Sequence, residues 1–526
     1  MDRQSFNHEH MLAAMGETGT YPHPAEGIIH LRTHISDVFL AGPYAYKVKK
    51  PVNLGFLDFT TLSGRWRACE DEVRLNRRLA PQIYLGVVPI LWIGGHYAVG
   101  SETDAMHAEV ADYAVKMARM PQDGLLNHLA TTGLLSNDQM RDIARQLACF
   151  HSRAERGPDI ERYGGLENIS HHVRQNFAQI EPYIDRSISR TQFDEIRNHA
   201  ERFMRDNATV FSARVDTGHI VDGHGDLHLG NMCLYGNAVI IFDCVEFSQQ
   251  FRSVDVISDI AFLTMDLDAY AQPQLGNCFI NEYLQRTDDY MGLTVLDFYQ
   301  AYRACVRGKV ISFLLDNQEG GLQRPAVASE ASRYFATAQK YTGTRTGGLL
   351  ITCGPSASGK TTVALQVAGS VGGIVVRSDA VRKHLAGMPL EQAQATPYGQ
   401  GLYSTEMTHR TYQALLERAR AIVASGRWAI LDATYLRHTQ RLQAAMLAQS
   451  LGIAFGIIHC DAPLHELERR LERRSSTQHD ISDATHAVLR TQIREFEPPE
   501  RDAAAVFRWT GSEDPVPWIN QLAAAG

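Results

Sequence analysis

Two carboxylates and an amide lie close together in the stretch VDGHGDLHLGNMCLYGNAVIIFDCVEF, which runs from Val221 to Phe247. Asp226 and Asn231 are five residues apart on one predicted loop, and Asp243 follows the apolar run AVIIF. Transfer of a phosphoryl group from ATP to a hydroxyl needs a carboxylate near the acceptor proton and oxygen ligands for Mg²⁺. We therefore expect Asp226 to be the catalytic base and Asn231 and Asp243 to bind the metal.

Other residues of this stretch have less specific roles. His224 is expected to orient the loop by a hydrogen bond to the backbone. Glu246 either supports the metal ligands without binding the metal itself or is a capping or surface carboxylate. A turn with satisfied polar side chains is the alternative for the whole loop, and the number of catalytic roles that fit at once argues against it.

A cation that holds the nucleotide is expected on an early strand, within AYKVKK. Lys47 is the favoured residue, and Lys49 competes with it because strand alternation puts both on one face, whereas Lys50 faces the other way. The following helix offers Glu70 and Glu72 as ion-pair partners. We prefer Glu72, which stands at the head of the apolar stripe in EVRLNRRL.

The motifs GHGDLHLGN, IFDCVEF and DVISDIAFL resemble the aminoglycoside phosphotransferase family of kinase-like enzymes, also called choline/aminoglycoside kinases. The resemblance covers roughly Ile28 to Gln339 and implies a two-lobed kinase-like fold with ATP at the interlobe cleft. It also implies that Asp255 or Asp259 supports the catalytic loop. A glycine-rich loop of the G-x-G-x-x-G kind is not evident. The segments AYKVKKPVNLGFLDF and CEDEVRLNRRLAPQIYLGVVPI resemble a subgroup in which such a domain is fused to a P-loop domain.

A second phosphate-binding motif, GPSASGKT, follows the apolar run LLITC and precedes the helical segment TTVALQVAG. It satisfies G-x-x-x-x-G-K-[ST], in which backbone N–H groups at a helix N-terminus hold phosphate oxygens. Lys360 would reach the β- and γ-phosphates, and Thr361 would bind Mg²⁺. The residues predicted to bind ATP are Lys47, Glu72, Gly354, Ser356, Ser358, Gly359, Lys360, Thr361 and Thr362.

Two carboxylates follow strands of this second half. Asp379 ends GIVVRSD and Asp432 ends WAILD, at the sheet edge where open α/β sheets bind ligands. This half is similar to small P-loop kinases such as polynucleotide kinase, zeta-toxin-like, gluconate and chloramphenicol phosphotransferase domains. The resemblance implies Asp379 as the base and leaves Asp432 as a metal or substrate ligand. Arg382 either grips the substrate or is a solvated helical arginine.

A lid helix is expected in HELERRLERRSS, because kinases of this kind neutralise the transferred phosphoryl group with lid arginines. Two registers at i, i+4 spacing are available, Arg470 with Arg474 or Arg469 with Arg473, and only one can point inward. We favour Arg470 and Arg474 as catalytic.

The surrounding pattern predicts mixed α/β and α+β structure. Hairpins are expected at DVFLAGPYAYKVKK and ILWIGGHYAVG, and helical patterns dominate from there to about Asn207. In the second half LLITC, GIVVRSD, WAILDAT and FGIIHCD predict a parallel sheet covered by helices. The expected division is a kinase-like domain over 1–339 (N-lobe about 28–120, C-lobe about 121–339), a linker at 340–346, and a P-loop NTPase domain over 347–526.

Composition narrows the function. The 526 residues carry a net charge of −8, which does not favour nucleic acid or an anionic membrane as partner. The eight cysteines are scattered, without CxxC, and no run of 18 apolar residues occurs, so we expect a cytoplasmic protein. The leading interpretation is a bifunctional Mg-ATP-dependent kinase acting on small hydroxyl-bearing molecules. Alternatives are a nucleotide-sensing regulator and a nucleic-acid end kinase.

Overall fold

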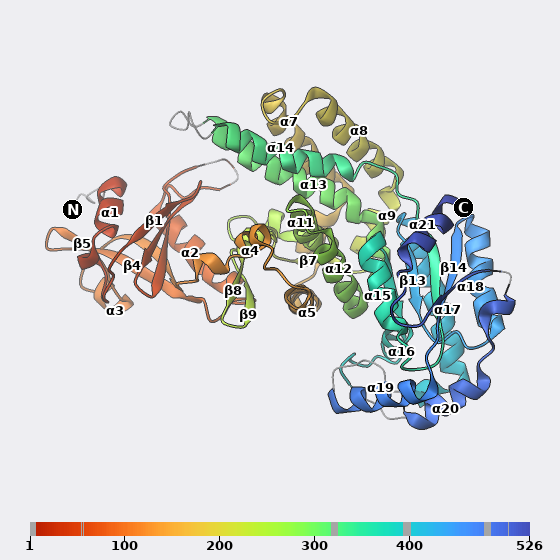
Figure 1. Cartoon of the computed structure of the whole chain (residues 1–526). Helices are drawn as coiled ribbons and strands as arrows, with labels where there is room; N and C mark the ends of the chain where they lie inside the picture. Colours follow the sequence, from red (N-terminus) through yellow and green to blue (C-terminus); the bar gives the residue numbers. More distant parts are fainter. Residues whose placement is uncertain are drawn as a thin grey trace. The chain divides into compact units, whose positions relative to one another are not determined.

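The structure is a computed structural model that describes residues 7–53, 55, 57–316, 324–392, 401–477, 485–502 and 504–525 (Figure 1). Within these ranges the chain forms two compact units, neither of them continuous in sequence. The first unit comprises Met1–Leu135, Cys149–Arg174 and Asn207–Asp266, and the second comprises Ser136–Ala148, Gln175–Asp206 and Leu267–Gly526. The second unit thus groups the helices after Leu267 with the P-loop half, whereas the expected linker at 340–346 stays a prediction.

A six-stranded antiparallel sheet dominates the first unit, with strand order β1-β2-β3-β6-β4-β5. Its strands are β1 (Ile29–Arg32), β2 (Ser36–Ala41), β3 (Tyr44–Lys49), β4 (Tyr84–Ile93), β5 (His96–Val99) and β6 (Glu109–Ala118). Both predicted hairpins are confirmed as β2–β3 and β4–β5. Gly94 and Gly95 turn the second hairpin with φ of +57° and +91°, values that favour glycine.

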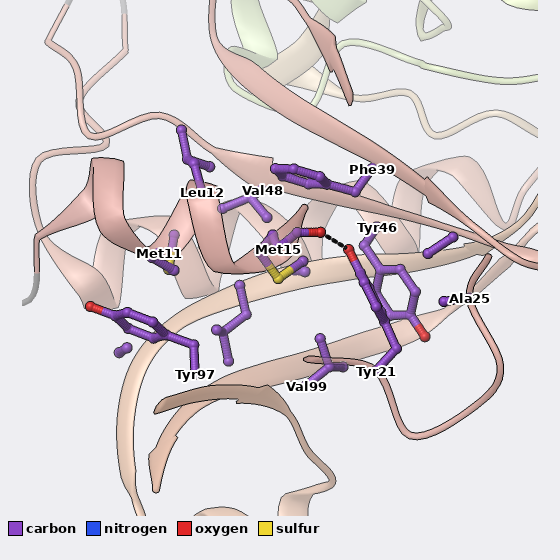
Figure 2. Packing of buried hydrophobic residues seen from close by; sticks show 14 residues of the cluster. Met11, Leu12, Met15, Tyr21, Ala25, Phe39, Tyr46, Val48, Tyr97 and Val99 are labelled. Carbon is purple, nitrogen blue, oxygen red and sulfur yellow. Dashed lines mark hydrogen bonds between the residues drawn. The ribbon is translucent and has the colours of Figure 1, made fainter. Parts of the chain in front are cut away.

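The two faces of this sheet have separate cores. On one face α1 (His8–Met15) buries its methionines against β-strand side chains, and the Tyr21 hydroxyl donates a 2.6 Å hydrogen bond to the Met15 carbonyl (Figure 2). On the other face Cys69 and Val73 of α2 (Leu62–Asn76) pack with Ala45 of β3. Since side chains alternate along β3, Lys47 and Lys49 lie on the α2 face.

Strand β6 corrects the prediction that helical patterns dominate after Gly100. Ala111 and Ala114 pack in the core beside α1, while Val115 and Met117 pack in the core beside α2. Because this central strand is buried on both faces, its apolar residues do not alternate with polar ones and match a helical spacing as well. The pattern alone could not separate the two structures.

The remainder of the kinase-like half is mainly helical, with small strand pairs around the predicted catalytic loop. The pairs are β7 (Ile220–Asp222) with β10 (Ser253–Asp255), and β8 (Met232–Tyr235) with β9 (Ala238–Ile241). The helices are α3 (Glu102–Ala105), α4 (Leu126–Thr132), α5 (Asn137–Arg153), α6 (Pro158–Glu161), α7 (Leu166–Ile180), α8 (Arg190–Asp206), α9 (Ala208–Asp216), α10 (Gln249–Arg252), α11 (Val256–Ala269), α12 (Pro273–Thr287), α13 (Leu293–Ser312) and α14 (Arg324–Lys340).

The second unit contains a five-stranded parallel sheet with strand order β12-β13-β11-β14-β15. Its strands are β11 (Gly348–Cys353), β12 (Ile374–Arg377), β13 (Ala429–Asp432), β14 (Ala454–Cys460) and β15 (Ala505–Trp509). The helices of this half are α15 (Lys360–Val371), α16 (Ser378–Leu385), α17 (Thr405–Ala424), α18 (His438–Leu451), α19 (Leu464–Thr477), α20 (His486–Glu495) and α21 (Val516–Ala525). The four predicted strands and the predicted fold class are confirmed; β15, a short edge strand, was not predicted.

Across the described ranges, none of the helices combines the length and the apolar character needed to cross a membrane.

Candidate active sites

Two buried lysines and three carboxylates form the first candidate site. Lys47 Nζ lies 2.8 Å from Glu72 Oε1 and 2.5 Å from Asp243 Oδ1. Lys49 Nζ lies 2.5 Å from the other oxygen, Glu72 Oε2, and also contacts Glu246. The sequence left Lys47 and Lys49 as alternatives for the cation that holds the nucleotide, and the structure places both against the preferred partner Glu72.

The charges of this network interact strongly because they are shielded from water: the Lys49 and Glu72 side chains are 0% exposed. Burial alone would raise the pKa of Glu72, but the ammonium groups of Lys47 and Lys49 lower that pKa to about 2. Burial likewise opposes the charged form of Lys47, yet Asp243 and Glu72 raise its pKa well above the ordinary value. Each charge is therefore stable only while its partners stay in place.

Asp243 is held by its backbone in an uncommon conformation. Its φ is +60°, in the left-handed region that non-glycine residues rarely adopt. The Asp243 N–H donates to the Tyr84 hydroxyl oxygen at 3.1 Å, and the Phe242 N–H donates to the Asn231 carbonyl at 3.0 Å. Asp243 and the residue before it are thus hydrogen bonded to β4 and to the loop of Asn231, and the Asp243 carboxylate is 39% exposed.

The predicted base and metal ligand meet in the loop after β7. Asn231 Nδ2 donates to Asp226 Oδ2 and to the Asp226 carbonyl, both at 3.0 Å. The amide oxygen of Asn231, the atom that would bind a metal, has no hydrogen-bond partner among the described residues. His228 Nδ1 accepts from the Gly230 N–H at 3.0 Å, so its ring proton lies on Nε2, 3.4 Å from Asp226 Oδ2.

Asp259 of α11 fixes the start of this loop. Its two carboxylate oxygens accept from the N–H groups of His224 (2.7 Å) and Gly225 (2.9 Å), and His151 Nε2 lies 3.3 Å away. Burial would raise the pKa of Asp259, but the hydrogen bond from His151 and the interactions with His224 lower this pKa to about 2. Of the two scaffold candidates, Asp259 supports the loop, whereas Asp255 pairs with Arg214 at 2.8 Å.

His224 links the loop to the strand that presents Asp243. Its Nδ1 accepts from the Asp226 N–H at 3.3 Å, and its Nε2 donates to the Phe242 carbonyl at 3.0 Å. Burial lowers the pKa of His224, which keeps the ring neutral for both bonds. A further support, Asp266 Oδ2 accepting from the Leu229 N–H at 2.9 Å, had no signal in the sequence.

The second candidate site is the turn between β11 and α15. Gly354 and Gly359 have φ of +140° and +97°. A Cβ on Gly359 would lie 2.4 Å from the Trp509 ring, and one on Gly354 would lie 2.5 Å from the Cys460 carbonyl oxygen. Both positions therefore require glycine. Between them Ser358 is buried, and its hydroxyl has no hydrogen-bond partner among the described residues.

The polar residues of the motif are hydrogen bonded within the protein, and one of them contacts Asp432, the carboxylate at the end of β13. Thr361 Oγ1 donates to Asp432 Oδ2 at 2.6 Å, and Lys360 Nζ donates to the Pro355 carbonyl at 2.7 Å. The Ser356 N–H, one of the predicted phosphate donors, donates to Gln492 Oε1 of α20 at 2.7 Å. Nothing in the sequence singled out Gln492. The Thr361–Asp432 pair is the donor set that P-loop NTPases use for Mg²⁺.

A cavity of about 480 Å³ opens beside this turn. Asp379, the predicted base, lies at the start of α16, and Arg382 Nη1 is 2.9 Å from Asp379 Oδ1. The Arg382 guanidinium lies 4.7 Å from the centre of the Tyr403 ring, and its Nε is buried without a partner among the described residues. Arg382 is therefore not a solvated arginine. The cavity is lined by Lys360, Thr361, Thr362, Asp379, Arg382, Tyr403, His409, Asp432 and Arg437, among others.

Helix α19 brings one predicted lid arginine to the phosphate-binding turn. Arg470 Nη1 donates to the Ala357 carbonyl at 3.4 Å, and its Nε donates to Glu466 at 2.7 Å. Arg469 pairs with the same glutamate on the solvent side. The side chain of Arg474 lies outside the described residues.

The two sites share a simple donor chemistry. Carboxylate, amide and hydroxyl oxygens are the ligands that Mg²⁺ prefers, and both sites offer them. Among the residues that the structure describes, no group of three or more His, Cys, Asp or Glu side chains could hold a metal ion by itself. The catalytic and metal-binding roles stay predictions.

Residues 349–499 match the family model described as AAA domain. The chain is similar to Uncharacterized protein Rv2004c of Mycobacterium tuberculosis and Uncharacterized protein Mb2027c of Mycobacterium bovis, each 32% identical over 487 residues, or 92% of this chain and 94% of the relative.

Two solved structures are similar to parts of the chain. A choline/ethanolamine kinase family protein from Mesorhizobium loti is 13% identical, covers 63% of this chain and 99% of its own, and has a TM-score of 0.36. The Mycobacterium tuberculosis APS kinase CysC, in complex with AMPPNP and APS, is 20% identical, covers 34% of this chain and 98% of its own, and has a TM-score of 0.26. These TM-scores are too low to support an argument about function. The chemistry of the two sites is therefore inferred from the geometry of this chain alone.

Proposed function

We propose, from the premise that the chain belongs to the family of the Mycobacterium tuberculosis protein Rv2004c, that it is an ATP-dependent phosphotransferase with two active sites. The family match spans 92% of the chain and therefore includes both halves. Each half would transfer the γ-phosphoryl group of ATP to a hydroxyl of a small molecule. The observation that carries the proposal is that each half brings together carboxylates, a lysine and side-chain oxygens of the kind that Mg²⁺ prefers.

In the first site the acceptor hydroxyl would give its proton to Asp226, which Asn231 and His228 orient. The acceptor oxygen forms a bond to the γ-phosphorus as the bond to the ADP oxygen breaks. Lys47 would hold the phosphates, and Asn231 and Asp243 would hold Mg²⁺. Bound Mg²⁺ supplies neutralisation of the charge that develops on the phosphate oxygens.

In the second site Asp379 would receive the acceptor proton, while Lys360 and the N–H groups of the turn hold the phosphates. Thr361 and Asp432 would hold Mg²⁺. Arg470, which already reaches the Ala357 carbonyl, would contact the transferred group, with Arg474 as its predicted partner.

The acceptor is proposed to be a small molecule and not a nucleic acid or a membrane lipid. The protein is proposed to work in the cytoplasm. The net charge of −8 supports this choice of acceptor. In the second site Arg382, which lines the cavity, favours an acceptor that carries a carboxylate, phosphate or sulfate, because a guanidinium binds such groups well.

The test is a screen of hydroxyl-bearing metabolites for ATP-dependent phosphorylation by the wild-type, Asp226→Ala and Lys360→Ala proteins in parallel. A product lost only in Asp226→Ala belongs to the first site, and a product lost only in Lys360→Ala belongs to the second. If nucleotide binds but the wild type phosphorylates none of the metabolites, the nucleotide-sensor alternative is favoured. Filter binding of RNA and DNA at two salt concentrations tests the end-kinase alternative; salt-sensitive binding would favour it.

A further inference from the structure

The edge of the P-loop sheet is covered by a helix from the kinase-like half. Strand β12 is the first strand in the order β12-β13-β11-β14-β15, so one side of its backbone has no partner strand within the described ranges. Helix α12 lies against that side, within the same compact unit. Exposed strand edges are usually protected by charges, bulges or a covering element, and α12 is the covering element here.

The side-chain amide of Asn281 forms the hydrogen bonds that a neighbouring strand would form with β12. Asn281 Oδ1 accepts from the Val375 N–H at 2.7 Å, and Asn281 Nδ2 donates to the Gly373 carbonyl at 3.1 Å. A neighbouring parallel strand would bond the same N–H and C=O, which are two residues apart on one side of the strand. Asn277 Nδ2 adds a second bond to the Gly373 carbonyl at 2.9 Å. Asn281 is thus fixed at both ends of its amide.

The same helix reaches the elements next to β12. His384 of α16 donates from Nε2 to the carbonyl of Gln285 at 2.8 Å. At the end of α12, Asp288 Oδ1 lies 2.7 Å from Arg418 Nε of α17. Polar bonds therefore connect α12 and the residue after it to β12, α16 and α17.

These three elements carry the acceptor side of the P-loop cavity. Strand β12 ends at Arg377, which lines the cavity, and α16 begins with Ser378 and presents Asp379 and Arg382. Asp379 is only four residues beyond Val375, the residue that Asn281 holds. The phosphate-binding turn, by contrast, follows β11, which is separated from β12 by β13.

We infer that α12 is a positioning element of the second active site and that Asn281 is its main positioning residue. This inference rests on the proposed phosphotransfer at Lys360. Asn281 contacts neither nucleotide nor acceptor; it fixes the backbone from which Asp379 and Arg382 extend. The P-loop site is then complete only in the presence of helix α12, which precedes the predicted linker in the sequence and belongs to the same compact unit as the P-loop sheet.

The experiment compares Asn281→Ala with Gln274→Ala, an exposed amide on the same helix, in the full-length protein. ADP formation from ATP, with water as the acceptor, is measured and the rate of Lys360→Ala is subtracted. We expect Asn281→Ala to lower kcat at least tenfold while the KM for ATP changes less than twofold. Asn277→Ala, which leaves the Val375 bond intact, should lower kcat by less, and Gln274→Ala should leave both constants unchanged.

Hydrogen–deuterium exchange supplies a readout that does not depend on turnover. In Asn281→Ala, exchange should rise in the segment 374–385 and stay unchanged in the turn 354–361. Faster exchange in 374–385 with unchanged kcat would overturn the positioning role, because the bonds would then be structural only. Equal losses in kcat and in ATP affinity would also overturn it. If Lys360→Ala forms ADP as fast as wild type, the proposed function of this site fails, and the inference falls with it.

Discussion

Replacement of Glu72 by glutamine tests whether the buried ion pairs hold the first site together. Glu72 is the shared partner of Lys47 and Lys49, one on each carboxylate oxygen. Glutamine keeps the shape of the side chain, removes its charge and turns an N–H donor toward one of the two ammonium groups. The two lysines would then depend on Asp243 and Glu246 alone.

The magnitude follows from the lowered pKa of Glu72. A fall from 4.5 to about 2, at 1.36 kcal/mol per pKa unit, corresponds to about 3 kcal/mol of stabilisation at neutral pH. Removal of one partner from a buried ion pair costs about 3–5 kcal/mol in other proteins, which agrees with this value. Since the pKa is lower in the folded state, this stabilisation is present above pH 4.5 and is lost as the pH falls toward 2.

Amide hydrogen exchange of β3 measures the effect within the first unit alone. A loss of about 3 kcal/mol predicts exchange roughly a hundredfold faster in Glu72→Gln than in wild type at pH 7. The control is Asp71→Asn on the same helix, whose exposed pair with Arg74 should change exchange less than about fivefold. A change in Glu72→Gln as small as that of Asp71→Asn, or a difference from wild type that does not narrow below pH 4.5, would refute the reasoning.

Three further outcomes are expected. Gly359→Ala places a Cβ 2.4 Å from Trp509 at a φ of +97° and should lower ATP affinity at the second site at least tenfold by calorimetry; Gly372→Ala, with φ of +64° but open space, should not change it. Asp432→Asn removes a charge from the proposed metal site and should weaken Mg²⁺ affinity in the presence of ATP about tenfold, measured by Mg²⁺ titration. Burial lowers the pKa of His224 below 6.5, so below this pH the unfolded state binds a proton that the folded state does not, and the wild type should lose thermal stability. The His224→Gln variant should lose less stability over the same range. Equal slopes of melting temperature against pH for the wild type and the variant between pH 5 and 8 would contradict this.

Local motifs were predictable because their chemistry is contained in a few consecutive residues. The spacing of Asp226 and Asn231 predicts one loop, and the structure has the two side chains hydrogen bonded. Lys360 and Thr361 lie where GPSASGKT predicts them, at the start of a helix that follows a buried strand. In both cases neighbouring residues define the geometry, so one sequence is enough.

Contacts between distant segments were not predictable in the same way. The two oxygens of Glu72 serve two lysines at once, and no spacing along the chain distinguishes this arrangement from a choice between them. Gln492 reaches the phosphate-binding turn from 136 residues away. Strand β6 was missed because both of its faces are buried, so its pattern carried no alternation. In each case the deciding neighbours come from other parts of the sequence.

The cover over β12 has a consequence for how the protein is made. Helix α12 ends at Thr287, and β12 begins only at Ile374, so the ribosome produces the covering helix long before the strand edge. Chains are synthesised from the N-terminus, and an unpaired edge invites association with other nascent chains. Here the partner of that edge is already present when the strand emerges. The order of segments in the gene therefore protects the folding of the second half.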